Sequence, residues 1–107
     1  MYQNWFVSQP MSGLTMDEIR KDRDRANLCI LKIVEKEWKS EDRIVYEILD
    51  NLAEDIPGYN SLDYLADDIK YLAKADCVFF CKGWETHRGC LCEFEIATRF
   101  GIPCYFE

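Results

Sequence analysis

The stretch DCVFFCKGWETHRGCLCEFEIATRFGIPCYF, from Asp76 to Phe106, decides the fold. It begins with a continuous apolar run at 76–81, which is typical of a strand covered on both faces of a sheet. A loop follows, and then a helix after Gly89 that ends at Gly101, because glycine commonly occupies the position just past a helix. Residues 102–106 have the pattern of a short closing strand. The order strand, helix, strand predicts a right-handed parallel crossover.

Strand and helix also alternate through the rest of the chain. Apolar periodicity and capping signals predict a strand at 4–8, a helix from 15 to about 38, a strand at 43–48 and a helix at 62–74. No hairpin dipeptide joins adjacent strands, and 107 residues with 49% hydrophobic content suit one domain, 1–107. We therefore expect a three-layer, flavodoxin-like or Rossmann-like α/β domain with a parallel sheet of about four strands.

Local signals place the helix starts and faces. Thr15 and Glu18 have the spacing of a capping box, and Ser61, after the Pro57-Gly58 turn, is placed as an N-cap. The charged run 21–25 is interpreted as a solvated face of the first helix. The core-facing stripe of the 62–74 helix is predicted to hold Leu62, Leu65, Ile69 and Leu72.

Charge and hydropathy exclude some classes of partner. The formal net charge is −7, from 20 acidic and 13 basic residues, which disfavours binding to a nucleic acid polymer. No apolar run approaches the length of about eighteen residues that a membrane span needs, so we expect no membrane partner. The start, MYQNWFVSQP, lacks the pattern of a secretion signal, and we expect a cytoplasmic protein.

The six cysteines are interpreted as reduced thiols rather than as a disulfide framework or a metal site. Their spacings lack paired CxxC motifs, and His87 is the only histidine and is interpreted as exposed and without a role. Three of them lie in predicted strands and are expected to behave as small buried hydrophobes, namely Cys77, Cys81 and Cys104. We expect neither a metal nor a cofactor.

Two carboxylates are candidates for chemistry. Glu93 is placed in the first turn of the last helix, on the stripe of Cys90, Ala97 and Phe100, where the helix dipole would keep it ionised as a nucleophile. Satisfying free helix amides is the equally open alternative for Glu93. In the preceding helix Asp68 lies at the edge of the core stripe, whereas Asp67, like Glu95 in the last helix, lies on the water side. Asp76, at the start of its strand, is assigned a turn or capping role at the opposite end of the sheet.

A glycine-flanked loop precedes the last helix. Gly83 and Gly89 would let backbone amides approach a ligand, although the loop is neither a GxGxxG nor a Walker motif. Arg88 would pair with a phosphate or carboxylate, or be solvated. Trp84 would stack on a base or cover the edge of the core, and the second reading is favoured.

Three motifs together resemble the nucleoside 2-deoxyribosyltransferase-like domains, especially the small phage and bacterial members of unassigned function. The first is the loop S-Q-P-M-S-G-L at 8–14. The second is Asp68-x7-Asp76 followed by the apolar strand. The third is G-W-E-x-x-R-G-x-x-x-E at 83–93. The resemblance spans nearly the whole chain and is weakest at 39–60.

The resemblance implies an enzyme that cleaves or exchanges the N-glycosidic bond of a (deoxy)nucleoside or nucleoside monophosphate. Glu93 would attack the anomeric carbon, and Asp68 would bind or protonate the departing base. It also implies a homo-oligomer, because relatives often complete their sites from a neighbouring subunit. The implied substrate-binding residues are Ser8, Gln9, Met11, Gly13, Gly83, Trp84, Arg88 and Gly89.

The chain departs from the family pattern at two points. Ser8 stands where an aromatic residue usually orients the nucleophile, and His87-Arg88 replaces an acidic residue that usually holds the sugar. An arginine there suits a phosphorylated sugar, as in nucleotide N-glycosidases. The alternative functions are a non-catalytic protein that binds, senses or sequesters a nucleotide, and a pure interaction domain.

Overall fold

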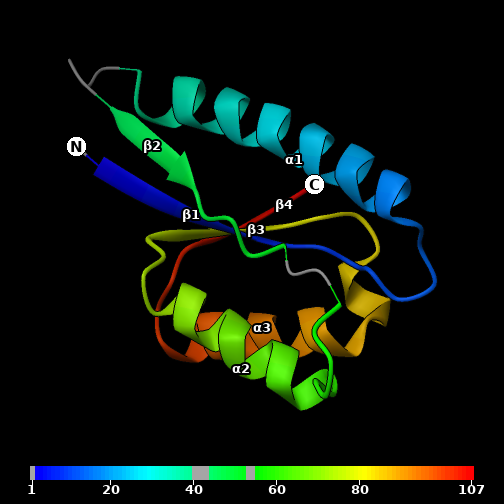
Figure 1. The fold of residues 1–107 in the computed structure, drawn as a ribbon. Coiled ribbons are helices and arrows are strands. Elements are labelled where there is room, and N and C mark those ends of the chain that lie inside the picture. Colours follow the sequence, from blue (N-terminus) through cyan, green and yellow to red (C-terminus); the bar gives the residue numbers. More distant parts are fainter. Residues whose placement is uncertain (1, 40–43, 53–54) are drawn as a thin grey trace.

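A parallel sheet of four strands, in the order β2-β1-β3-β4, lies at the centre of the described part of the chain. The computed structural model describes residues 2–39, 44–52 and 55–107. Helix α1 covers one face of the sheet, and α2 and α3 cover the other (Figure 1). This arrangement confirms the expected three-layer α/β fold. The elements are β1 (Tyr2–Ser8), α1 (Met16–Glu37), β2 (Val45–Ile48), α2 (Ser61–Leu72), β3 (Cys77–Phe80), the 3-10 turn η1 (Trp84–Thr86), α3 (Arg88–Arg99) and β4 (Cys104–Phe106).

The two central strands supply both layers of the core. Successive side chains of a strand point to opposite faces, so Trp5 and Val7 pack on the α1 side while Phe6 packs on the α2/α3 side. All four residues of β3 are buried, as expected for its apolar run. Each large side chain buried in this way contributes about 1.5–3 kcal/mol. Cys77 and Cys81 belong to the α1-side core, whereas Cys104 is only half-buried.

The start of α1 follows the sequence prediction. The Thr15 hydroxyl accepts a hydrogen bond from the backbone N–H of Glu18 at 3.2 Å, and the Glu18 carboxylate accepts one from the backbone N–H of Thr15 at 3.1 Å. This is the predicted capping box. It fixes where the chain leaves the 8–14 loop and turns along the sheet.

The start of α2 corrects the prediction for Ser61. The N-cap is Asn60, whose side-chain oxygen accepts from the backbone N–H groups of Leu62 and Asp63 at 2.9 and 3.0 Å. The Asp63 carboxylate in turn accepts a hydrogen bond from the Asn60 backbone N–H at 2.8 Å, which completes a capping box. Asn60 satisfies two free amides that Ser61, already inside the helix, cannot reach.

The inner face of α2 is also rotated from its predicted position. Leu62 and Ile69 are exposed, by 73% and 41%, so their assignment to the core stripe was wrong. Leu72 is buried, and Leu65 and Asp68 are half-buried. Because Leu65, Asp68 and Leu72 follow helical spacing, they share the sheet-facing side, and Asp68 lies within this stripe rather than at its edge.

Helix α3 ends as predicted but begins two residues earlier, at Arg88. Gly101 has φ +72° and its N–H bonds the Thr98 carbonyl, while the Ile102 N–H bonds the Ala97 carbonyl. This pair of bonds is a Schellman motif, which uses the left-handed conformation that glycine tolerates. Phe100, the C-cap residue, is 79% exposed, so its place on the buried stripe was wrong.

The strands differ from the predicted ones mainly at their ends. β1 begins earlier than predicted and β4 later, and residue 43 lies outside the described residues. At the amino end of β3, the Asp76 carboxylate accepts from the Asn4 N–H at 2.8 Å, which matches its predicted capping role at the end of the sheet away from Ser8. No helix in the described ranges is long and apolar enough to cross a membrane.

The order of the strands fixes where a ligand site is favoured. From β1 the chain crosses through α1 to β2 on one side, whereas β3 lies on the other side of β1. The connections on the two sides cover opposite faces (Figure 1). In open α/β sheets such a switch leaves a crevice at the carboxyl ends of the two strands. Here those ends are Ser8 and Phe80, which pair in register.

The cap assignment predicts different costs for two neighbouring substitutions. Asn60→Ala removes the acceptor for two amides in the first turn of α2 and is expected to lower the free energy of unfolding by about 1 kcal/mol. Ser61→Ala is the matched control and is expected to change it by less than about 0.5 kcal/mol. Urea denaturation followed by circular dichroism measures both. A larger loss for Ser61→Ala than for Asn60→Ala would contradict the assignment.

Candidate active site

Ser8 and Glu93 meet at the switch point. Ser8 ends β1 and has the same side-chain parity as Phe6, so it points to the α2/α3 side of the sheet. Its hydroxyl lies 2.6 Å from Glu93 Oε1 and donates to it. Both residues are buried, Ser8 to 1% exposure and Glu93 to 4%. The end of the central strand thus fixes one oxygen of the Glu93 carboxyl.

Glu93 lies in the second turn of α3, not the first. The helix begins at Arg88, no acidic residue occupies its first turn, and Glu93 is too deep to cap free amides. The expectations that it interacts with the helix dipole and satisfies free amides are therefore wrong. Glu93 faces inward because it shares a buried stripe with Cys90 and Ala97, as predicted.

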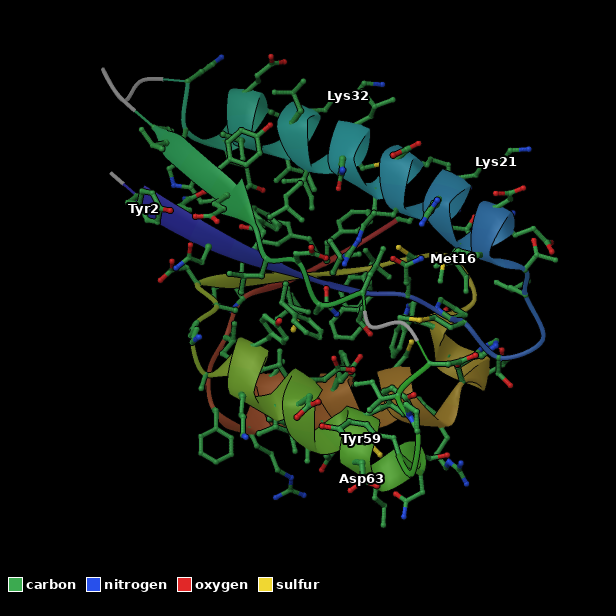
Figure 2. The ribbon with its side chains drawn as sticks, viewed as in Figure 1. Tyr2, Met16, Lys21, Lys32, Tyr59 and Asp63 are labelled. Atoms are coloured by element: carbon green, nitrogen blue, oxygen red, sulfur yellow. The ribbon has the colours of Figure 1, made fainter. Side chains whose placement is uncertain are left out.

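Asp68 reaches the same place from α2. Its side chain forms a hydrogen bond with Glu93 and another with Asn51. Asp67 instead accepts a hydrogen bond at 2.9 Å from the exposed Tyr59 hydroxyl, so the choice of Asp68 over Asp67 as the inward carboxylate is correct. Figure 2 shows Tyr59 and Asp63 together at the amino-terminal end of α2, on its outer side.

Burial sets the protonation of the two carboxyls. Burial raises the pKa of Glu93 to about 9, with the neighbouring Asp68 adding to the effect and the Ser8 hydroxyl opposing it. Burial also raises the pKa of Asp68, which hydrogen bonds from Glu93 and Asn51 and the charge of Arg23 hold down. Two carboxyls in contact cannot both ionise cheaply. The pair therefore holds one proton near neutral pH, on Glu93, and the expectation of an ionised Glu93 is corrected.

Two further residues complete the buried network, and the sequence analysis missed both. Arg23, on α1, is only 8% exposed and donates from Nη2 to Asn51 Oδ1 at 2.5 Å. Asn51, in the segment after β2, donates from Nδ2 to the Val7 carbonyl at 3.2 Å. The five side chains Ser8, Glu93, Asp68, Asn51 and Arg23 form one hydrogen-bonded network, which we call the carboxyl network.

The inward position of Arg23 contradicts its place in a solvated charged run. Lys21 and Lys32 point away from the sheet, as the run predicts (Figure 2). Arg23, however, is spaced four residues from Ile19 and three from Ala26, both buried, so it belongs to the apolar stripe. This helical spacing is the feature of the sequence from which the inward position of Arg23 could have been predicted.

The first loop adjoins the glycine loop near this network. A Cβ built on Gly83 would lie 3.7 Å from the Pro10 side chain, so the two predicted ligand loops are neighbours. Gln9 is buried and donates from Nε2 to the Ile19 carbonyl at 2.9 Å. Met11 is half-buried, and Gly13 is exposed at the tip of the loop with φ +80°. Gln9 thus holds the loop on α1, whereas Gly13 lies farther out.

The other residues of the glycine loop do not join the carboxyl network. Trp84 packs on Phe80, Phe94 and Phe106 with ring centroids 4.8–5.3 Å apart, which confirms that it covers the edge of the core. Arg88 and Gly89 are exposed. The only hydrogen bond of Arg88 among the described residues is to the Ser61 hydroxyl, at 3.4 Å.

His87 is half-buried rather than exposed. Its Nδ1 lies 3.0 Å from the Gly83 carbonyl oxygen, so the ring closes the 3-10 turn before α3. Within the described residues, no group of three or more His, Cys, Asp or Glu side chains is placed to hold a metal ion.

The cysteines are all unpaired thiols. Cys90 lies beside the carboxyl network, and burial raises the pKa of its thiol to about 11, despite a hydrogen bond with Ser8. Burial raises the pKa of Cys81 to about 12 in the same way. Both thiols therefore stay protonated near neutral pH and are poor nucleophiles.

Two surface recesses flank the segment after β2. One has a volume of about 380 Å³ and is lined by Asn51 together with residues of α2. The other has a volume of about 220 Å³ and is lined by Arg23, Asn27 and the 48–52 segment. Glu93 lines neither recess. Each recess instead borders one member of the carboxyl network, Asn51 in the first and Arg23 in the second.

The chain matches no protein-family model, no curated protein and no solved structure.

The raised pKa of Glu93 predicts that this residue destabilises the fold at high pH. In the unfolded chain a glutamate ionises near its ordinary pKa, so stability falls as pH rises from there toward 9. Glu93→Gln keeps a donor for Asp68 and an acceptor for Ser8 without ionising. We expect it to raise the free energy of unfolding at pH 8 by about 2–4 kcal/mol, since one unit of pKa is worth about 1.4 kcal/mol.

Urea denaturation of both proteins across pH 4 to 9 measures this effect. The two stabilities should converge toward pH 4, where Glu93 is protonated in both states. Glu95→Gln, on the exposed side of the same helix, is the matched control; it retains Glu93 and should follow the wild-type pH dependence. Equal pH dependence of Glu93→Gln and wild type would contradict a protonated Glu93.

Proposed function

We propose that this protein cleaves or exchanges the N-glycosidic bond of a (deoxy)nucleoside or nucleoside monophosphate, with Glu93 as nucleophile and Asp68 as acid and base. The observation that carries the proposal is the hydrogen-bonded Asp68–Glu93 pair at the carboxyl edge between β1 and β3, in which Glu93 is buried and Asp68 half-buried. The three motifs that resemble nucleoside 2-deoxyribosyltransferase-like domains supply the substrate class. Ser8, Asp68 and Glu93 each belong to one of these motifs.

The pair combines one carboxylate with one protonated carboxyl, which is what such a reaction needs. A nucleophilic displacement at the anomeric carbon requires one carboxylate, and departure of a neutral base requires one proton. Two carboxyls that hold a single proton provide both. Transfer of that proton from Glu93 to Asp68, along their hydrogen bond, makes Glu93 the anion and Asp68 the acid.

The reaction then proceeds in two balanced steps. A Glu93 oxygen forms a bond to the anomeric carbon as the carbon–nitrogen bond breaks, and Asp68 gives its proton to the leaving base. In the second step a water or another base forms a bond to the same carbon and the Glu93 ester breaks. Asp68 takes the proton of the incoming group, and return of that proton to Glu93 along their hydrogen bond restores the resting state. Ser8 holds the second Glu93 oxygen throughout.

The substrate must replace the contact between the two carboxyls. Hydrogen-bonded carboxyls lie closer than the separation of about 5 Å found in enzymes that form a glycosyl ester. The sugar therefore enters between Asp68 and Glu93, and the buried site opens at one of them. Arg88 is exposed and lies outside the carboxyl network. Its proposed role is therefore to bind the phosphate of a nucleoside monophosphate, and it has no role toward an unphosphorylated nucleoside.

A second candidate is a protein that binds a nucleotide without turnover. The raised pKa of Glu93 favours it, because a protonated carboxyl donates a hydrogen bond to a ligand instead of attacking it. The two candidates share the site and differ in whether the proton moves to Asp68.

Incubation with a panel of nucleosides, deoxynucleosides and their monophosphates, followed by chromatography, tests the enzyme. Wild type should release free base, and Glu93→Gln should lower the rate by more than about a thousandfold. Asp68→Asn should lower it by about a hundredfold to ten-thousandfold, as expected for loss of an acid–base group. Glu95→Gln, the matched control, should keep the wild-type rate.

Two results would contradict the enzyme. One is the absence of base release by wild type across the panel, and the other is equal release by Glu93→Gln. Thermal stabilisation of wild type by a nucleotide, without any product, would instead establish the binding function.

A further inference from the structure

Arg23 is a buried cation whose hydrogen bonds only partly use its capacity. The guanidinium has five N–H donors and no acceptor. Nη2 is bonded to Asn51, and Nη1 is buried without a partner among the described residues. Burying a cation in this way is costly unless a nearby negative charge compensates it. Burial lowers the pKa of Arg23, and negative groups including Asp50 and Asp68 oppose that shift.

The bond to Arg23 determines how Asn51 is turned. Because the guanidinium can only donate, the Asn51 oxygen must face Arg23. The Asn51 amide nitrogen then faces the Val7 carbonyl, which can only accept. The same nitrogen is the group left to meet Asp68. Asn51 therefore acts as a donor toward Asp68.

The donor-to-acceptor direction set by Asn51 also determines the hydrogen bond between Asp68 and Glu93. A carboxyl that accepts from Asn51 is favoured in its ionised form. An ionised Asp68 accepts from Glu93, so Glu93 must carry the proton that lies between them. Ser8, at the far end, donates to the other oxygen of Glu93. All the bonds of the carboxyl network thus have a defined direction, which begins at Arg23.

We propose that Arg23 is a positioning residue that, through Asn51, keeps Asp68 ionised and places the shared proton on Glu93 in the resting protein. As a role in catalysis this inference rests on the proposed function, in which Asp68 must receive that proton and release it to the base. A positive charge beside Asp68 makes the protonated form of Asp68 a stronger acid for the second of these transfers.

The other charged and titratable groups that face Asp68 and Arg23 in the described residues are acids and thiols, so none of them supplies a positive charge. Asp68 is faced by Asp67 on its own helix and by Glu93 and Cys90 on α3. Arg23 is faced by Asp50 after β2 and Cys81 after β3. The charge of Asp67 raises the pKa of Asp68, whereas the hydrogen bond from Glu93 lowers it, and the two thiols are neutral near pH 7. Arg23 is the one cation that acts on Asp68 among the described residues.

Carboxyl ¹³C NMR of the substrate-free protein tests the inference. In wild type at pH 7 the Glu93 signal should be that of a protonated carboxyl and the Asp68 signal that of a carboxylate. Arg23→Gln, which removes the charge and can accept as well as donate, should raise the titration midpoint of Asp68 by about 1 pH unit or more. Arg20→Gln, an exposed position on the same helix, is the matched control and should leave both midpoints unchanged.

Two variants keep the test decisive where Arg23→Gln does not fold. Arg23→Lys retains a positive charge that can only donate, and its Asp68 midpoint should stay near the wild-type value. Asn51→Leu leaves Arg23 in place but interrupts the network, and its Asp68 midpoint should rise. An unchanged Asp68 midpoint in folded Arg23→Gln, or in Asn51→Leu, would overturn the inference.

The NMR result is independent of turnover. A shifted Asp68 midpoint in a protein that releases no base from any substrate would refute the proposed function and leave the role of Arg23 in the carboxyl network standing. Turnover by wild type, together with an unchanged Asp68 midpoint in Arg23→Gln, would support the proposed function and refute the role of Arg23. In an active protein, Arg23→Gln should also move the acidic limb of the pH–rate profile to higher pH, in the direction of the Asp68 midpoint.

Discussion

The rest of the site depends on one electrostatic constraint: two carboxyls in contact, away from water, cannot both be charged. Glu93 and Asp68 are brought together from different helices by the packing of α2 and α3 on one face of the sheet. The groups around them fit that constraint. Ser8 donates to one member of the pair and Asn51 to the other, and the charge of Arg23 offsets the single negative charge that remains. A neutral cluster of this kind can be buried, whereas an unpaired carboxylate cannot.

The architecture could be predicted from the sequence because its signals are local and repeated. The apolar run 77–80 has the pattern of a strand buried on both faces, and the Thr15–Glu18 spacing and Gly101 mark helix ends through contacts with their immediate neighbours. The choice of Asp68 over Asp67 and of Glu93 over Glu95 also followed from helical spacing. Such spacing orders the residues around a helix even where the absolute rotation is uncertain.

The missed features required knowledge of what lies opposite each helix. The predicted rotation of α2 placed every leucine and isoleucine inward, but the carboxyl network occupies part of the space between this helix and the sheet, so Asp68 faces inward and Ile69 outward. Arg23 was assigned to water by its charge, although the spacing from Ile19 placed it on the inner side. Its long side chain crosses the end of the sheet to Asn51, a residue in an irregular segment with no periodicity to read.

The hydrogen bond between Ser8 and Glu93 joins residues 85 positions apart, and the central strand β1 pairs with β3 from the last third of the chain. Contacts of such long sequence separation are slow to form, because chain closure costs entropy before any contact repays it. The carboxyl pair is therefore assembled only in a chain in which α2 and α3 have both docked on the sheet. While either helix is undocked, the two acids are hydrated separately and no proton is shared between them.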